Sequence, residues 1–224
     1  MKHDNRISLI IPTLNEEKNL PFILKKIPYF IDEIVVVDGF SKDHTVDIAK
    51  KYGCKVIFDN YGKGSALILG AKKSTGDYLV MMDADCSNRT RELKSLIDGL
   101  EQGNDICMGS RFLPGGGSQD LTTIRKLGNK FFVLLVNLFY GSNYTDLCYG
   151  YRSMTKDAFH SLNLTSKGFS IETEMSIRAA KKRMKILEVP SQEKERRSGE
   201  SKLRTFSDGW KIMRKIIEEF SRDD

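Results

Sequence analysis

Residues 7–38 read ISLIIPTLNEEKNLPFILKKIPYFIDEIVVVD and contain the patterns of a strand, a helix and a second strand. Ile7 to Ile11 is a short apolar run, rich in β-branched residues and ended by a proline, which is typical of a buried strand. Asn19 can cap the helix that follows, and we expect this helix to continue to about Ile27. A second buried strand is predicted at 34–38. Strand, helix and strand in this order form the unit from which parallel sheets are built.

The same alternation continues through the rest of the chain. Further helices are predicted at 45–52, 65–74, 91–102, 122–140, 155–162, 171–182 and 206–220. Further strands are predicted at 55–59, 77–83, 105–110, 145–154 and 185–189. Strands that alternate with helices imply right-handed crossovers, so the fold class is α/β with a single Rossmann-like, mostly parallel sheet flanked by helices. No repeat or linker divides the chain, and we expect one domain over 1–224.

The composition is that of a soluble globular domain. Hydrophobic residues make up 40% and charged residues 29% of the 224 residues, which is too polar for a bundle of spanning helices. The longest apolar stretch, 131–140, is far shorter than the roughly 20 residues that a bilayer crossing needs. The net charge of +6 indicates an anionic partner. Because no apolar leader precedes the first strand, we expect the protein in the cytoplasm.

The cysteines argue against zinc and against disulfides. The four cysteines form no CxxC pair, and the three histidines do not cluster with them. We therefore expect reduced thiols.

Asp83-Ala84-Asp85 directly follows the apolar run 78–82, where two acids have little structural use. In an extended backbone, residues i and i+2 face the same side, so both carboxylates point together at the end of the strand. Ligands of parallel sheets bind beyond these carboxyl ends. Paired carboxylates suit Mg²⁺ or Mn²⁺, which can stabilise a departing diphosphate. The pattern by itself also fits solvated loop acids or helix caps.

Several motifs occur in the order and spacing of one enzyme family. They are Pro12-Thr13-Leu14-Asn15-Glu16-Glu17, Val35-Val36-Val37-Asp38-Gly39, Gly62-Lys63-Gly64, Asp83-Ala84-Asp85 and Gly109-Ser110-Arg111-Phe112. With them the chain resembles the inverting family 2 glycosyltransferases, whose GT-A fold is built around one nucleotide-binding α/β sheet. Later motifs look like the dolichyl-phosphate mannosyltransferase and glucosyltransferase branch: Thr145-Asp146, Gly150-Tyr151-Arg152, Phe169 with Glu172, and Arg197-Ser198-Gly199-Glu200-Ser201-Lys202. The resemblance covers about residues 7–212.

The resemblance implies a nucleotide-binding part at about 7–112 and an acceptor part at about 113–224. The nucleotide-binding residues that it implies are Pro12, Leu14, Glu16, Asp38, Lys63 and Asp83. It also implies that Asp83 and Asp85 hold a Mg²⁺ or Mn²⁺ ion and that Asp85 is catalytic. Gly39 stands where many members have a second Asp, and Ser87 stands where the mannosyltransferases often have a Gln. These departures leave GDP-mannose and UDP-glucose open as donors.

A phosphate acceptor is favoured by charge. A sugar hydroxyl usually needs a positioned general base during attack, whereas a lipid phosphate is already an anion at neutral pH. That phosphate needs positive charge to hold it beside the donor diphosphate, and arginine binds phosphate oxygens bidentately. The residues expected to contact the acceptor phosphate are Arg111, Arg125, Arg197 and Lys202. We expect Arg111, Arg197 and Lys202 to be catalytic as well.

These expectations combine into one function. The chain should transfer a single hexose, with inversion, from GDP-mannose or UDP-glucose to a polyprenyl or dolichyl phosphate, as a peripheral protein on the inner face of the cytoplasmic membrane. One alternative is a family 2 enzyme that glycosylates a hydroxyl of a glycan or glycolipid, with Asp146 as the first candidate base. The other is a non-enzymatic basic module that binds membranes or nucleic acid. An RNA-binding sheet would display aromatic residues where this one has carboxylates, so no nucleic-acid partner is expected.

The stretch 131–140 is apolar nearly all round, which is more than one helix stripe requires. It fits a buried helix, or an interfacial element beside the acceptor with Arg125, Lys126 and Lys130 facing anionic lipids.

The sequence lacks the motifs of three other protein classes: P-loop proteins, sugar nucleotidyltransferases and processive polysaccharide synthases. Ile57 occupies the place of the first glycine of a P-loop before Gly62-Lys63-Gly64-Ser65. A sugar nucleotidyltransferase needs a basic, glycine-rich loop after the first strand, and this loop is acidic. Residues 192–196 lack the Trp of the QxxRW motif of processive polysaccharide synthases.

Overall fold

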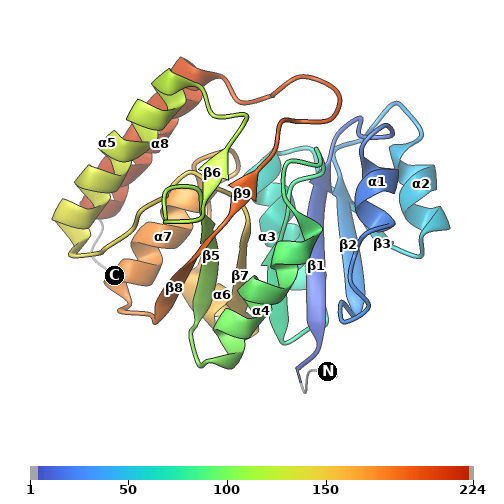
Figure 1. Cartoon of the computed structure of the whole chain (residues 1–224), viewed down its shortest axis with the longest axis horizontal. Coiled ribbons are helices and arrows are strands. Elements are labelled where there is room, and N and C mark those ends of the chain that lie inside the picture. The colour runs from blue at the N-terminus through green and yellow to red at the C-terminus, as the bar shows by residue number, and fades with distance from the viewer. Residues whose placement is uncertain (1–4, 222–224) are drawn as a thin grey trace.

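The computed structural model describes residues 5–221, and these form one central sheet and a small ribbon (Figure 1). The strands of the sheet are β1 (Ile7–Thr13), β2 (Glu33–Asp38), β3 (Lys55–Phe58), β4 (Tyr78–Met81), β5 (Ile106–Ser110), β7 (Arg152–Thr155) and β8 (Ile186–Pro190). Their spatial order is β3-β2-β1-β4-β7-β5-β8. All neighbours pair in parallel except β7, which is antiparallel to both β4 and β5. The prediction of a mostly parallel α/β sheet is confirmed.

Helices cover both faces of this sheet. They are α1 (Leu20–Leu24), α2 (Thr45–Lys51), α3 (Lys63–Lys73), α4 (Leu93–Glu101), α5 (Thr123–Tyr140), α6 (Lys156–Leu162), α7 (Ile171–Lys181) and α8 (Thr205–Phe220). The apolar side chains of α1, α2 and α4 pack on one face, and those of α3, α6 and α7 pack on the other. The ribbon pairs β6 (Gly117–Ser118) with β9 (Gln192–Glu193) in parallel.

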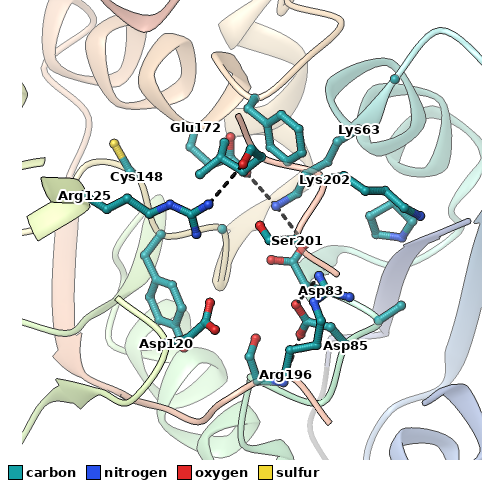
Figure 2. A pocket seen from close by; sticks show the side chains of 18 of the residues that line it. Lys63, Asp83, Asp85, Asp120, Arg125, Cys148, Glu172, Arg196, Ser201 and Lys202 are labelled. Atoms are coloured by element: carbon teal, nitrogen blue, oxygen red, sulfur yellow. Dashed lines mark hydrogen bonds and ion pairs between the residues drawn. The ribbon is translucent and has the colours of Figure 1, made fainter. Parts of the chain in front are cut away.

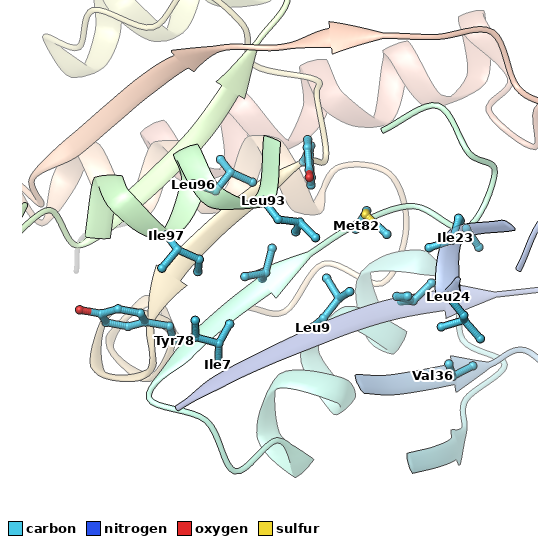
Figure 3. Close-up of a cluster of buried hydrophobic side chains, with 14 of the residues drawn as sticks. Ile7, Leu9, Ile23, Leu24, Val36, Tyr78, Met82, Leu93, Leu96 and Ile97 are labelled. Atoms are coloured by element: carbon cyan, nitrogen blue, oxygen red, sulfur yellow. The ribbon is translucent and has the colours of Figure 1, made fainter. Parts of the chain in front are cut away.

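The period-two pattern of β1 produces the two cores. Ile7 and Leu9 face the first cluster, where Leu24 of α1 and Leu93 of α4 meet them (Figure 3). Ile10 points to the opposite face and contacts the side-chain cluster of α3. Full burial of each such side chain stabilises the fold by about 1.5–3 kcal/mol, so the sheet is a rigid platform for whatever lies at its edge.

A third cluster joins α5 and α8 to the second half of the sheet. The two helices lie side by side at one end of the molecule (Figure 1), and Val136 and Ile216 are fully buried between them and their neighbours. The hydroxyl of Thr122 accepts from the backbone N–H of Arg125 and caps α5. Gly141 ends α5 in the left-handed region, with φ of 63°.

The structure corrects two details of the predicted elements. Asn19 does not cap α1, because its side-chain amide donates to Glu16 at 2.6 Å and to the carbonyl of Ser198 at 3.0 Å, and α1 ends at Leu24. The predicted strand at 145–154 forms only from Arg152 onward.

Side chains explain the shortened strand. The carboxylate of Glu188 accepts from the N–H groups of Thr145 and Asp146, and Asn129 accepts from those of Leu147 and Cys148. Backbone donors of this segment are therefore satisfied by side chains and do not join a ladder.

Candidate active site

A cavity of about 620 Å³ opens at the carboxyl ends of β1, β2 and β4 and extends between α5 and α8. The predicted site residues that line it are Pro12, Leu14, Glu16, Lys63, Asp83, Asp85, Arg111, Arg125 and Lys202. They come from both halves of the sequence, and Figure 2 labels Lys63, Asp83, Asp85, Arg125 and Lys202 among the side chains around the cavity. Asp38 and Arg197 are not among the lining residues.

Lys63, the first residue of α3, lies between two acids. Its Nζ is 2.7 Å from Asp83 and 3.0 Å from Glu172 of α7 (Figure 2). Burial alone would lower the pKa of Lys63, but the two carboxylates outweigh it and the pKa is raised. Gly150 makes this arrangement possible, because a Cβ there would lie 2.9 Å from the lysine Nζ. Lys63 is therefore a fixed positive charge at the floor of the cavity.

Asp85 faces a different cation. Its Oδ2 lies 2.8 Å from Nη2 of Arg196, and the same guanidinium reaches Glu16 at 3.3 Å through Nη1. Oδ1 of Asp85 accepts from the backbone N–H of Ser87 at 2.9 Å. Both carboxylates of the Asp83-Ala84-Asp85 motif are thus at the exit of β4, and each is paired with a cation of the chain itself.

These two carboxylates fit a divalent metal ion that shares its ligands with a substrate. Within residues 5–221 no group of three or more His, Cys, Asp or Glu side chains could hold a metal alone. Mg²⁺ and Mn²⁺ are commonly bound by one or two carboxylates together with substrate phosphates. Lys63 and Arg196 are already paired with these carboxylates, which is consistent with a site that binds positive charge.

Glu16 and Asp38 have different surroundings although both lie at the carboxyl end of a strand, Glu16 after β1 and Asp38 as the last residue of β2. Burial raises the pKa of Glu16, against the hydrogen bond from Asn19 and the charge of Arg196. Asp38 has no exposed surface, and its carboxylate accepts from the hydroxyl of Thr13 and from the backbone N–H and hydroxyl of Ser41. Asp38 therefore shapes the loop after β2 in this structure, while Glu16 lines the cavity.

Arg111 is occupied by carboxylates. It donates to Asp146 through Nε and Nη2, at 2.7 and 2.9 Å, and it pairs with Glu193 at 3.2 Å. Burial alone would lower the pKa of Arg111, but the charges of Asp146 and Glu193 raise it. Arg111 was predicted to contact the acceptor phosphate. In this structure its guanidinium instead forms a buried ion pair with Asp146, which holds the end of β5 to the 145–151 segment. Asp146 has no exposed surface, and both of its carboxylate oxygens accept from Arg111.

The remaining predicted cations separate into two groups. Arg125 and Lys202 reach the cavity: Arg125 donates to the carbonyl of Leu203 at 3.0 Å, and Lys202 donates to the carbonyl of Leu14. Arg197 instead stacks on the ring of Phe22, with its guanidinium carbon 3.6 Å from the ring centroid. The cavity is reached by the neighbouring Arg196, which the sequence did not single out.

The far half of the cavity is apolar. Its walls between α5 and α8 include Leu121, Ile124, Phe132, Phe206 and Ile212. Of the two interpretations of 131–140, a fully buried helix does not match the structure. Val136 is buried, but the following apolar side chains of α5 and α8 face outward: Ile124, Leu127, Phe131, Leu134, Leu138, Phe139, Phe206, Trp210, Ile217 and Phe220.

Besides Arg196, sequence reasoning missed two residues of the site, Glu172 and Asp120. Glu172 was recognised only as part of a motif, and its partner Lys63 is more than a hundred positions away. Asp120 is exposed at the cavity wall and lies in a loop without a motif. The four cysteines are free, as predicted, and burial raises the pKa of Cys148 to about 12, so this lining residue is a thiol at neutral pH.

The family model for glycosyl transferase family 2 matches residues 8–162. The chain belongs to glycosyl transferase family 2. This family 2 chain is 32% identical to the low-salt glycan biosynthesis hexosyltransferase of Haloferax volcanii over 94% of its own length, and it spans 53% of that relative. It is 34% identical to the dolichol-phosphate mannosyltransferase of Pyrococcus furiosus, with 89% of the chain and 59% of the relative covered. The chain thus spans little more than half of these two relatives.

A shorter relative is covered more completely. The family 2 chain is 33% identical to the undecaprenyl-phosphate mannosyltransferase of Micrococcus luteus, over 88% of the chain and 87% of the relative. Among solved structures, glucosyl-3-phosphoglycerate synthase from Mycobacterium tuberculosis, in complex with Mn²⁺, UDP and glucosyl-3-phosphoglycerate, matches with a TM-score of 0.76 at 18% identity. That match covers 99% of this chain and 82% of the other, and it shows the GT-A fold.

Proposed function

We propose that this chain transfers one hexose, with inversion, from GDP-mannose or UDP-glucose to the phosphate of a polyprenyl or dolichyl lipid. The observation that carries the proposal is the two-part cavity. Acids and cations lie at the strand ends, and an apolar passage between α5 and α8 continues from them. A nucleotide sugar needs the first part, and a lipid phosphate needs both. Two relatives named as polyprenyl-phosphate mannosyltransferases support the same acceptor class.

The proposed division of labour follows the cavity walls. Residues 7–112 contribute Pro12, Leu14 and Glu16 to the nucleotide end, while residues 113–224 contribute Arg125 and Lys202 to the acceptor end. Since both parts line one cavity, we propose that they act as a single domain. Asp38 supports the nucleotide end indirectly, by holding the loop that follows β2.

Asp83 and Asp85 are proposed to hold a Mg²⁺ or Mn²⁺ ion. Such an ion would neutralise the charge that develops on the leaving diphosphate. Lys63 supports the same charge from the floor of the cavity, because its ammonium is fixed by Glu172 beside Asp83. The mycobacterial structural neighbour crystallised with Mn²⁺ and UDP is consistent with a divalent ion.

The acceptor is proposed to attack without a protein base, because a lipid phosphate arrives ionised. Arg125 and Lys202 would hold its oxygens near the donor and reduce the repulsion between the two phosphate groups. Arg111 and Arg197 were predicted to share this role. Both would first have to leave their present partners, Asp146 and the ring of Phe22.

We propose that the enzyme works on the cytoplasmic membrane surface as a peripheral protein. Within residues 5–221 no helix is long and apolar enough to span a bilayer. The outward apolar side chains of α5 and α8 nevertheless form a surface that a lipid headgroup region would cover, and they border the apolar end of the cavity.

The test is a transfer assay with a panel of radiolabelled GDP and UDP sugars. Polyprenyl phosphate and the matching dephosphorylated alcohol serve as acceptors, and the product is counted in the organic phase. We expect transfer to the phosphate alone and from one of the two nucleotide classes. Equal rates on phosphate and alcohol would overturn the phosphate-acceptor mechanism.

One observation favours a second candidate, transfer to a hydroxyl. Asp120 is exposed at the cavity wall and has room to serve as a general base, unlike Asp146. The non-enzymatic alternative predicts that GDP or UDP with Mn²⁺ leaves the melting temperature unchanged, whereas either enzyme would be stabilised by its nucleotide.

A further inference from the structure

Segment 194–204, which contains neither helix nor strand, lies across the nucleotide end of the cavity. Three backbone contacts hold it there. The N–H of Lys194 donates to the backbone carbonyl of Ser87 at 2.9 Å, and the N–H of Arg197 donates to the backbone carbonyl of Asp85 at 3.1 Å. The carbonyl of Ser198 accepts from the side-chain amide of Asn19 at 3.0 Å. The segment thus connects the loop after β1 with the loop after β4.

Arg196 is the charged contact at the centre of this connection. Its guanidinium bridges Glu16, in the loop after β1, and Asp85, in the loop after β4. The Arg196 side chain is 20% exposed, so the pair is mostly shielded from solvent. No other cation of the described residues is paired with Asp85.

Each oxygen of Asp85 already has one partner. Oδ1 accepts from the backbone N–H of Ser87, and Oδ2 is paired with Arg196. A guanidinium at 2.8 Å from Oδ2 disfavours a metal ion at the same oxygen, because the two cations repel each other. Lys63 differs from Arg196, since its ammonium is anchored from behind by the buried Glu172.

We propose that Arg196 occupies the metal position at Asp85 until a divalent ion enters, and that its displacement releases segment 194–204. The inference rests on the proposed function, since it assumes a metal at Asp83 and Asp85. The displacement breaks the bridge that Arg196 makes between Glu16 and Asp85. Donor binding thereby loosens the segment that carries Lys202 before the acceptor arrives.

The test compares Arg196→Gln with Arg197→Gln. The two variants lose the same charge from adjacent positions, but Arg197 contacts Phe22 and no carboxylate of the motif. Mn²⁺ binding to the protein alone is measured by electron paramagnetic resonance of the free ion. We expect Arg196→Gln to tighten Mn²⁺ binding about three- to tenfold and Arg197→Gln to leave it unchanged. Equal affinity in the two variants would contradict the displacement.

Hydrogen exchange of residues 194–204 gives a second readout. Mn²⁺ should accelerate exchange in the wild-type chain, and Arg196→Gln should exchange fast without Mn²⁺. Unchanged exchange in the wild type on adding Mn²⁺ would refute the release of the segment.

A further variant and a further result separate failure of this inference from failure of the proposed function. If Arg196→Gln lowers the melting temperature severely, Arg196→Lys, which keeps a charge but a single-point contact, should bind Mn²⁺ with intermediate affinity. If neither the wild type nor any variant binds Mn²⁺, with or without GDP or UDP, the proposed metal-dependent function fails together with this inference. If Mn²⁺ binds with the same affinity to the wild type and to the Arg196 variants, the inference fails but the proposed function does not.

Discussion

The carboxylate of Asp146 accepts two hydrogen bonds from the guanidinium of Arg111, at 2.7 and 2.9 Å, and neither side chain is more than 6% exposed. Removing one partner of such a pair leaves a buried charge without compensation. We expect Asp146→Asn to lower the free energy of unfolding by about 3–5 kcal/mol. Urea denaturation measures the change. As a control, Asp98→Asn breaks the exposed pair with Lys94 and should cost about 0–1 kcal/mol.

Asp85→Asn should abolish transfer and metal-dependent nucleotide binding while the fold survives, because Asp85 lies at a strand exit and outside the core. Asp83→Asn should also cost strongly, since it weakens the position of Lys63. Nucleotide titrations with and without Mn²⁺, combined with melting curves, separate the two effects. Near-normal turnover in Asp85→Asn would contradict the metal assignment.

The charge of Lys202 should determine how the transfer rate falls at alkaline pH. Its ammonium lies against the loop after β1, where desolvation lowers its pKa below 10.5. The cation is therefore present at neutral pH and is lost as pH rises through this lowered pKa. We expect transfer to decline below pH 10.5, and Lys202→Arg to move the decline to higher pH because a guanidinium stays charged. Transfer rates of the wild type and of Lys202→Arg are measured from pH 7 to 10.5. The same alkaline decline in both proteins would exclude Lys202 as its cause.

Asp120 distinguishes the two acceptor classes. If the acceptor is a lipid phosphate, Asp120→Asn should keep kcat within about threefold, because no proton has to be removed. If the acceptor is a hydroxyl, the same change should lower kcat by about 10²–10⁴-fold. Steady-state rates with polyprenyl phosphate test the first case, and a large loss there would contradict attack without a protein base. Rates with a hydroxyl acceptor test the second case.

Leu134 and Leu138 test the surface formed by α5 and α8. Both side chains are exposed, at 62% and 72%, so replacing them with Gln should change the free energy of unfolding by no more than about 0.5 kcal/mol. The double variant should bind anionic lipid vesicles less well in co-sedimentation. Tyr29→Gln, at an exposed site before β2, is the matched control and should bind vesicles as the wild type does. Equal binding by all three proteins would mean that another surface meets the membrane.

Local patterns predicted most of the fold. The apolar runs of β1, β2 and β4 identify buried strands without knowledge of their partners, and this places Asp83 and Asp85 at the correct edge of the sheet. Pairing between distant residues was not predicted. Arg111 and Asp146 are 35 positions apart, and nothing in either neighbourhood states that they meet.

Segment 194–204 has no sequence pattern that predicts which of its side chains face the site. Arg196 and Arg197 are adjacent and chemically identical, and irregular backbone has no period that assigns a side chain to a face. Only the folded chain distinguishes them, since Phe22 receives Arg197 and the two acids receive Arg196.

The position of β7 between β4 and β5 also governs how the chain can be synthesised and divided. β5 is bonded only to β7 and β8, so a fragment that stops at residue 112 would leave β5 without any neighbour in the sheet. During synthesis, β5 leaves the ribosome more than forty residues before β7, the first strand that can pair with it. Until then the apolar side chains of β5 have to be covered by α4 or by a chaperone. Expression of the nucleotide-binding part alone should therefore yield aggregates, and a cut placed after residue 155 is the earliest that leaves β4 and β5 joined.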